Sequence, residues 1–453
     1  MATLAALLKS RGHDVRGSDQ NVYPPMSDFL AAERIPAMMG YSADHITSDV
    51  DLVVVGNAIS RGNPELETVL ERKIRYCSLP EAIRDYFLWG ARSVVIAGTH
   101  GKTTTTALTG WLLTHGRLDP TVLVGGIALN LGENGSSYRV GSGRDFVIEG
   151  DEYDSAFFDK TAKFLKYLPD VAVVNNIEFD HADIYADLDA VRLAFRRLVS
   201  LVPRNGLLLL GADSADAAAL GERAVSPVET FGMSEDSTWQ AHDVEHADGM
   251  TRFEVRRRGQ PFERFESPLL GLHNVRNALA AVAVANYVGI DPADIAEGLR
   301  RFRGIKRRLE IVGVEDGVTV LDDFAHHPTA VRETLAALRT GYPERRIWAV
   351  FEPRSASSCR RVFQDDFARA FDAADEIVIA GVFRSSLPES ERLSPELLVD
   401  DLHRNGQHAR YVPEVDEIIS TIVTEHRRGD VVVLMSNGGF GGIHRKLLQA
   451  LAT

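Results

Sequence analysis

One stretch, Ser93–Thr106, constrains this chain more than any other. Its β-branched run Val94–Ile96 is typical of a buried parallel strand, and a turn with Gly98 and Gly101 follows. Lys102 then opens a helical stretch. A strand, a glycine turn, a lysine and a helix in this order favour a phosphate-binding turn over a plain glycine turn.

Each part of such a turn has a physical task. Glycines let backbone N–H groups approach phosphate oxygens, and a helix N-terminus favours negative charge. Lys102 would neutralise the β- and γ-phosphates, and the Thr103 hydroxyl would reach Mg²⁺. The spacing is shorter than in the common P-loop, because only two residues separate the glycines. The sequence therefore predicts a nucleotide site with these residues, which the resemblance described below assigns to ATP: Gly98, Thr99, His100, Gly101, Lys102, Thr103 and Thr104.

The composition limits the remaining possibilities. A chain of 453 residues suggests about three domains. Its net charge of −14 argues against a nucleic-acid partner. Cys77 and Cys359 have no metal-type spacing, and no apolar run has the length of a membrane helix. We expect a cytoplasmic enzyme without disulfides and without a membrane partner.

The chain reads as an α/β protein with three domains, which we place at residues 1–92, 93–303 and 304–453. The first domain begins with a helix over residues 1–9 and a strand at His13–Arg16, followed by Ser18 and Asp19. A helix at Pro80–Trp89 closes it. This order matches the second half of a βαβ unit, so we expect a Rossmann-like domain that lacks its first strand and glycine turn.

Acidic residues and a histidine follow two strands of the central domain. Strand Asp145–Glu149 runs into an acidic cluster, which is either a Mg²⁺ site with Glu149 or a solvated turn. Strand Val171–Ile177 is followed by Glu178 and His181. His181 is either a second metal ligand or a structural histidine.

Two further patterns complete the central domain. Residues 226–270 alternate apolar and polar positions, which predicts a smaller antiparallel sheet. Asn274 and Asn277 lie on one face at the start of an apolar helix, where they either cap the helix or bind a ligand. The third domain alternates strands and helices, which predicts a Rossmann-like α/β sandwich.

Six segments occur in an order that resembles the Mur ligases, and the resemblance spans essentially the whole chain: Gly98–Thr105, Glu149, Asn176–His181, His273–Asn277, Lys306–Arg308 and Asp322–Pro328. Five others resemble the branch of that family whose acceptor is a murein tripeptide: Asn21–Ser27, Gly56–Pro64, Asp151–Lys160, Glu352–Ser355 and Met435–Gly442.

The resemblance implies an ATP- and Mg²⁺-dependent ligase that activates UDP-N-acetylmuramate as an acyl phosphate. The implied catalytic residues are Lys102, Glu149, His181 and Arg308, and the implied metal ligands are Thr103, Glu149 and His181. Asn274, Asn277, Arg308 and Asp323 would contact ATP. Ser18, Asp19 and Asn57 would lie near the UDP-sugar, and Arg354 near a carboxylate of the peptide.

Two departures from the family pattern qualify this expectation. The glycine loop for the UDP diphosphate is missing, and Arg192–Arg197 contains no lysine that could carry the carbamate found in many members. Three alternatives stay open. They are a ligase that adds L-alanine alone, a folylpolyglutamate synthase, which has no domain like residues 1–92, and a nucleotide-binding protein without turnover.

Overall fold

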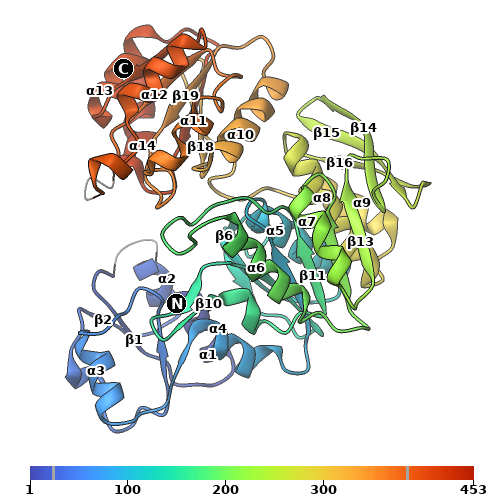
Figure 1. The fold of residues 1–453 in the computed structure, drawn as a ribbon, viewed down its shortest axis with the longest axis vertical. Helices are drawn as coiled ribbons and strands as arrows, with labels where there is room; N and C mark the ends of the chain where they lie inside the picture. The colour runs from blue at the N-terminus through green and yellow to red at the C-terminus, as the bar shows by residue number, and fades with distance from the viewer. Residues whose placement is uncertain (23–25, 384–386, 453) are drawn as a thin grey trace.

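The computed structural model describes residues 1–22, 26–383 and 387–452, and it is a mixed α/β structure in three parts. In Figure 1 the C-terminal part lies above the central part, and the N-terminal part lies below it to the left. The segment Asn21–Ser27, which contributed to the resemblance, is partly outside the described residues. The predicted three-part α/β architecture is confirmed, whereas the boundaries at residues 92 and 303 stay predictions.

The central part is built on one long sheet with the order β16-β15-β14-β13-β12-β11-β5-β8-β6-β7. Its strands are β5 (Arg92–Ala97), β6 (Thr121–Ala128), β7 (Ser136–Arg139), β8 (Asp145–Gly150), β11 (Val171–Val174), β12 (Leu207–Gly211), β13 (Val228–Gly232), β14 (Trp239–Ala247), β15 (Met250–Arg257) and β16 (Gln260–Ser267). A hairpin, β9 (Asp154–Ala156) and β10 (Asp159–Ala162), and the helices α5 (Lys102–His115), α6 (Leu188–Val199), α7 (Ala215–Ala218), α8 (Leu272–Tyr287) and α9 (Pro292–Arg300) complete it.

Strand β5 lies between β8 and β11 and pairs with both in parallel. Val94 and Ile96 face a core formed with α5, α8 and α9, whereas Val95 and Ala97 face a second core formed with α6 and two N-terminal helices. Because helices cover both faces, every residue of the strand can be apolar. The turn after β5 therefore starts from a rigid base.

The prediction of a smaller, separate antiparallel sheet at residues 226–270 is wrong, because these strands belong to the long central sheet. Strand β13 pairs in parallel with β12 on one side and, through Phe231 and Trp239, with β14 on the other. The antiparallel strands β14–β16 therefore extend the main sheet, at the right of Figure 1. The buried rings of Trp239, Phe253 and Phe265 belong to the same core as α8, which is a contact that strand alternation cannot reveal.

The C-terminal part has the sheet order β17-β18-β22-β19-β20-β21, with only β17 antiparallel to its neighbour. Its strands are β17 (Glu310–Glu315), β18 (Val318–Asp323), β19 (Ile347–Phe351), β20 (Glu376–Ile379), β21 (Ala409–Tyr411) and β22 (Val431–Met435). Its helices are α10 (Pro328–Gly341), α11 (Gln364–Phe367), α12 (Pro395–Arg404), α13 (Val415–Glu425) and α14 (Ile443–Leu451). The polar residues that follow β18, β19 and β22 therefore share one edge of this sheet.

The N-terminal part contains two parallel strand pairs, β1 (Gly17–Asp19) with β2 (Ala37–Met39), and β3 (Val53–Val55) with β4 (Tyr76–Ser78). Its helices are α1 (Ala2–Ser10), α2 (Met26–Ala32), α3 (Pro64–Glu71) and α4 (Leu79–Ile83). The strand predicted at His13–Arg16 is wrong, because the backbone that pairs with β2 begins at Gly17. The helix predicted over Pro80–Trp89 is α-helical only to Ile83 and continues as a π-helix at Arg84–Leu88. In the part of the chain that the structure describes, no helix is long and apolar enough to cross a membrane.

Candidate active site

The glycine turn between β5 and α5 has the backbone that the sequence predicts. Gly98 has a φ of 132° and Gly101 a φ of 78°, conformations that glycine adopts without steric cost. The end of the neighbouring strand β11 holds the turn from one side. Thr99 N–H donates to the Asn176 carbonyl at 3.0 Å, and His100 N–H donates to Asn176 Oδ1 at 2.8 Å.

Helix α8 supports the same turn from the other side. A Cβ atom on Gly101 would lie 2.3 Å from Asn277 Oδ1, so a side chain has no room there. The Thr105 hydroxyl donates to Asn277 Oδ1 at 3.2 Å, and Asn277 Nδ2 donates to Asn274 Oδ1 at 3.1 Å. Asn274 Nδ2 donates to the Leu270 carbonyl at 2.8 Å. The structure therefore brings both predicted asparagines to the glycine turn, in a chain of hydrogen bonds.

Lys102 is held by a carboxylate that belongs to the acidic cluster. Its Nζ lies 2.8 Å from Glu152 Oε2 and 2.7 Å from the Gly98 carbonyl. Burial alone would lower the pKa of Lys102, but the charges of Glu152 and Asp151 outweigh it and raise that pKa. Lys102 is therefore a cation at neutral pH, directed into the turn.

His181 binds the same carboxylate, with its Nε2 at 2.8 Å from Glu152 Oε1. Its φ of 53° is left-handed, a conformation that is uncommon outside glycine but tolerated by histidine. Burial alone would lower the pKa of His181, but the hydrogen bond and charge of Glu152 raise it. His181, Glu152 and Asp151 form a group with metal-ligand atoms within 4.8 Å of one another.

Thr103 and Glu149 form a second group beside the turn. The Thr103 hydroxyl donates to Glu149 Oε1 at 3.0 Å, and Gly125 N–H donates to Glu149 Oε2 at 2.8 Å. Burial raises the pKa of Glu149, and the charge of Lys102 opposes the rise. Oxygen donors of this kind suit Mg²⁺. Of the three predicted metal ligands, the structure pairs Thr103 with Glu149, whereas His181 lies against Glu152.

The residues after β11 also contact the C-terminal part. The Ser357 hydroxyl donates to Asp180 Oδ1, and Ala182 N–H donates to the Ser357 hydroxyl at 3.4 Å. His327 Nε2 lies 3.1 Å from the Phe179 carbonyl. His181 therefore lies in a segment, residues 179–182, whose residues before and after the histidine bind the C-terminal part.

The C-terminal residues predicted for ATP lie at the end of β18. Asp323 is buried, and it accepts hydrogen bonds from Leu309 N–H and Ala325 N–H, each at 2.8 Å. Burial raises the pKa of Asp323, and the charge of Arg308 opposes the rise. The Arg308 guanidinium lies 5.3 Å from the centre of the Phe324 ring. Asp323 therefore holds the backbone at Leu309 and Ala325 in place.

Arg354 follows β19 at the same edge. Its guanidinium lies 3.6 Å from the centre of the Phe383 ring, and its Nη1 lies 3.4 Å from Glu352 Oε1. The Ser436 hydroxyl, which follows β22, donates to Glu352 Oε2. Arg354, Glu352 and Ser436 therefore lie together at the carboxyl ends of the neighbouring strands β19 and β22.

The residues predicted for the UDP-sugar make contacts within the N-terminal part. Ser18 donates to Glu65 Oε2, and Asp19 Oδ1 accepts from Asn21 N–H at 3.2 Å. Ser18 and Asp19 lie within β1, and Asn57 follows the end of β3.

Sequence reasoning gave no individual role to four residues that the structure places in the site: Glu152, Asn175, Asn176 and Glu178. Their signal was their position directly after the buried strands β8 and β11, where parallel sheets present ligand-binding groups.

Three family models match the chain. The Mur ligase family catalytic domain matches residues 1–87, the Mur ligase middle domain matches residues 96–285, and the Mur ligase glutamate ligase domain matches residues 307–438.

Curated relatives match over the full length. The UDP-N-acetylmuramate–L-alanyl-γ-D-glutamyl-meso-2,6-diaminoheptandioate ligase of Escherichia coli is 41% identical, over 100% of this chain and 96% of the relative. The ligase of the same name from Haemophilus influenzae is 39% identical over the same shares. The UDP-N-acetylmuramate–L-alanine ligase of Caldanaerobacter subterraneus is 34% identical, over 99% of this chain and 95% of the relative.

Two solved structures are similar over nearly the whole chain. The murein peptide ligase of Psychrobacter arcticus has a TM-score of 0.74 at 35% identity, covering 100% of this chain and 96% of its own. The UDP-N-acetylmuramate–alanine ligase of Thermotoga maritima has a TM-score of 0.80 at 27% identity, covering 99% and 96%.

Proposed function

The chain belongs to the Mur ligase family, and from this premise we propose that it is the ATP-dependent ligase that joins UDP-N-acetylmuramate to L-alanyl-γ-D-glutamyl-meso-diaminopimelate. The observation that carries the proposal is the 41% identity, over the whole chain, to a ligase with that acceptor. The UDP-N-acetylmuramate–L-alanine ligase of Agrobacterium fabrum is less similar, at 37% identity over 97% of this chain. The geometry of the site supports the following roles for its residues.

The glycine turn and the start of α5 would hold the ATP phosphates. Gly98 and Gly101 leave the backbone accessible, and the N-terminus of α5 favours negative charge. Lys102 would exchange Glu152 for the phosphate oxygens, which keeps its charge paired throughout. Asn277 would fix the turn beneath the nucleotide.

The oxygen pair Thr103 and Glu149 would hold Mg²⁺, and His181 would hold a second ion beside the reacting carboxylate. Bound Mg²⁺ neutralises charge on the transferred phosphoryl group. The carboxylates of Glu149 and Asp151 supply negative charge for such ions. Lys163 and Lys102 hold the pKa of Asp151 low despite its burial, so its carboxyl group is ionised.

The reaction has two balanced steps. A carboxylate oxygen of the muramyl group attacks the γ-phosphorus of ATP, and ADP leaves, which gives an acyl phosphate. The α-amine of the peptide then attacks the acyl carbon, loses a proton, and inorganic phosphate leaves as the amide bond forms. Positioning and charge neutralisation provide most of the catalysis in such transfers.

The three parts of the chain would divide the substrates among them. Ser18, Asp19 and Asn57 would bind the UDP-sugar. Arg354 would bind a peptide carboxylate, and Arg308 would reach the phosphates. Helix α6 contains arginine but no lysine, so we propose that no lysine carbamate takes part.

The test is phosphate release by the purified chain with ATP, Mg²⁺ and UDP-N-acetylmuramate, comparing L-Ala-γ-D-Glu-meso-diaminopimelate with L-alanine. We expect release with the tripeptide, together with a UDP-linked tripeptide product in the mass spectrum. Reactions without UDP-N-acetylmuramate control for simple ATP hydrolysis. Release with L-alanine alone would transfer the assignment to the L-alanine ligases, and release with neither acceptor would contradict a ligase function.

A further inference from the structure

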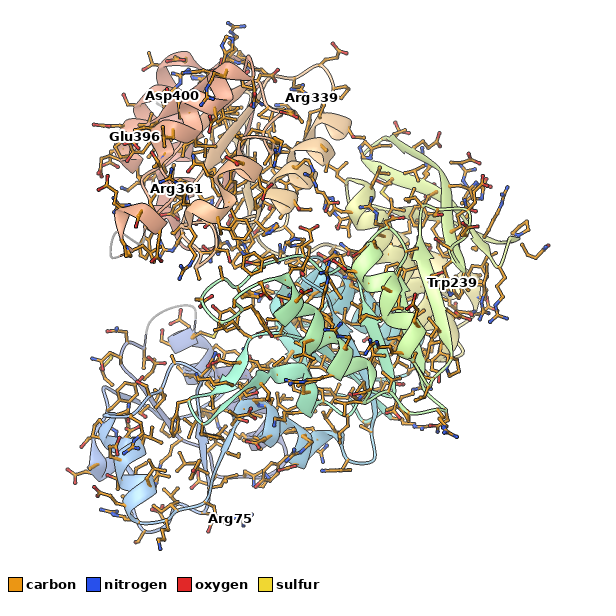
Figure 2. All side chains as sticks on the ribbon, in the orientation of Figure 1. Arg75, Trp239, Arg339, Arg361, Glu396 and Asp400 are labelled. Atoms are coloured by element: carbon orange, nitrogen blue, oxygen red, sulfur yellow. The ribbon has the colours of Figure 1, made fainter. Side chains whose placement is uncertain are left out.

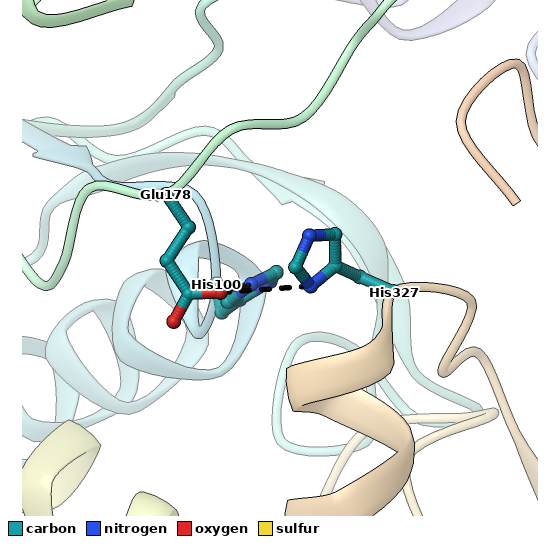
Figure 3. Close-up of side chains that lie close together, drawn as sticks. All are labelled: His100, Glu178 and His327. Carbon is teal, nitrogen blue, oxygen red and sulfur yellow. Dashed lines mark hydrogen bonds and ion pairs between the residues drawn. The ribbon is translucent and has the colours of Figure 1, made fainter. Parts of the chain in front are cut away.

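A further group of side chains that could bind a metal ion lies beside the glycine turn. His100 comes from the turn itself, Glu178 follows β11, and His327 precedes α10 in the C-terminal part. Their ligand atoms all lie within 4.8 Å of one another. Figure 3 shows both imidazole rings directed at the same carboxylate.

The distances suit a small cation. His100 Nε2 lies 3.3 Å from Glu178 Oε2, and His327 Nδ1 lies 3.6 Å from the same oxygen. Ligands about 2.0–2.1 Å from a tetrahedral zinc ion are about 3.3–3.4 Å apart. Only small movements would therefore bring these three atoms into coordination.

The tautomer of His327 is also suitable. Its Nε2 lies 3.1 Å from the Phe179 carbonyl, which can only accept a hydrogen bond, so Nε2 carries the proton. Nδ1 then carries the lone pair, which accepts a long hydrogen bond of 3.3 Å from Thr329 N–H. A metal ion would take this lone pair in place of that bond. Metal-bound histidines commonly donate their second N–H to a carbonyl in this way.

The carboxylate oxygen that faces both histidines has a further contact. The Thr329 hydroxyl donates to Glu178 Oε2 at 2.6 Å, which holds the carboxylate in place beside the two rings.

We propose that His100, Glu178 and His327 form a binding site for Zn²⁺ that links the central and C-terminal parts. Two imidazoles and one carboxylate are ligands typical of zinc, whereas Mg²⁺ prefers oxygen. This site is separate from the oxygen pair Thr103 and Glu149. The third candidate group, His242, Asp243 and Glu254, lies on β14 and β15, with both carboxylates exposed.

The test is titration of the nucleotide-free full chain with Zn²⁺ by calorimetry, in excess Mg²⁺. We expect a zinc ion whose affinity falls at least about 100-fold in His100→Ala and in Glu178→Gln, since outer contacts alone can change metal affinity 10- to 100-fold. His327→Asn is the third variant, because asparagine retains an acceptor for the first turn of α10. Circular dichroism checks that each variant is folded.

His242→Ala is the matched control, and it should leave this affinity unchanged. His181→Ala tests whether zinc binds at His181 instead, and it should also leave the zinc affinity unchanged. X-ray absorption at the zinc edge should show two imidazole nitrogens at about 2.0–2.1 Å. The proposal is overturned if the wild-type chain binds no zinc in the presence of Mg²⁺. It is equally overturned if His181→Ala or His242→Ala removes the zinc while His100→Ala and Glu178→Gln retain it.

Discussion

At the scale of the residue, the site depends on charges that are buried together. Glu152 is 2% exposed and binds both Lys102 and His181. The buried negative charge of Glu152 is therefore balanced by the two basic side chains. A charge without a partner would be costly at this depth. Pairing with Glu152 therefore keeps the lysine ionised and in place.

Replacing this lysine by a side chain of similar length tests its role. We expect Lys102→Met to lower kcat by about 10²- to 10³-fold, because one fixed charge on the phosphates is lost. Ligation assays at saturating substrate measure the effect, and circular dichroism checks folding. Near-normal kcat in a folded Lys102→Met chain would refute the phosphate-binding role.

A thiol provides a pH-dependent prediction. Burial, followed by the charges of Glu81 and Asp85, raises the pKa of Cys77 to about 11. Only the thiolate reacts with thiol reagents, so at pH 8 Cys77 should react roughly 100-fold more slowly than a free cysteine. Its rate should rise about tenfold per pH unit below pH 11. Cys77→Ala identifies the signal, because Cys359 is fully buried. A rate that is flat with pH would contradict the raised pKa.

Lys102 could be predicted from the sequence, because its motif is local. Glu178 could not be assigned a role, since its partners His100 and His327 are distant along the chain and meet only in the folded structure.

At the scale of the element, the start of α5 depends on its packing against α8. Gly101 has a left-handed backbone, and its Cα faces Asn277 without space for a methyl group. Any side chain at residue 101 would therefore force Asn277 to move and would strain the backbone at the start of the helix.

A pair of glycine variants separates backbone strain from steric clash. Gly101→Ala and Gly289→Ala both place alanine at positive φ, at a cost of about 1–2 kcal/mol. No atom lies near the Cβ position of Gly289, so only Gly101→Ala adds a clash. We expect Gly101→Ala to destabilise the chain more in urea unfolding and to weaken ATP binding at least about tenfold. Equal effects of the two variants would show that the contact with Asn277 is unimportant.

The elements that sequence patterns predict well are those buried on both faces. β11 is apolar throughout and β5 is apolar from Val94 to Ala97, so their strand character was evident. β1 was misplaced because its three residues, Gly17–Asp19, carry no apolar pattern and become a strand only by pairing with β2. The parallel pairing of β13 with β14 was not predicted either, because the sequence pattern of a strand does not show which strand it pairs with.

At the scale of the whole molecule, the site is completed only where the parts meet. Figure 2 shows side chains filling the region between the C-terminal and central ribbons. The family resemblance predicted this meeting of parts, but the specific contacts Asp180–Ser357 and His327–Phe179 could not be predicted, because their geometry depends on how two sheets are oriented.

The hydrogen bond between Ser357 and Asp180 offers a test of this docking. We expect Ser357→Ala and Asp180→Asn each to lower kcat/KM for ligation by roughly tenfold, since hydrogen bonds to charged groups contribute about 1.5–3 kcal/mol. The double variant should lose little more than either single one, because both remove the same contact. Fully additive losses would indicate that the two residues act independently.

The segment 179–182 links the position of His181 to that of the C-terminal part. It carries His181 and also the bonds from Ser357 and His327 to the C-terminal part. Withdrawal of the C-terminal part would therefore release the histidine from its place beside Glu152. A chain whose C-terminal part is withdrawn would therefore lack an assembled phosphoryl-transfer site, and it would hydrolyse little ATP until the parts meet again.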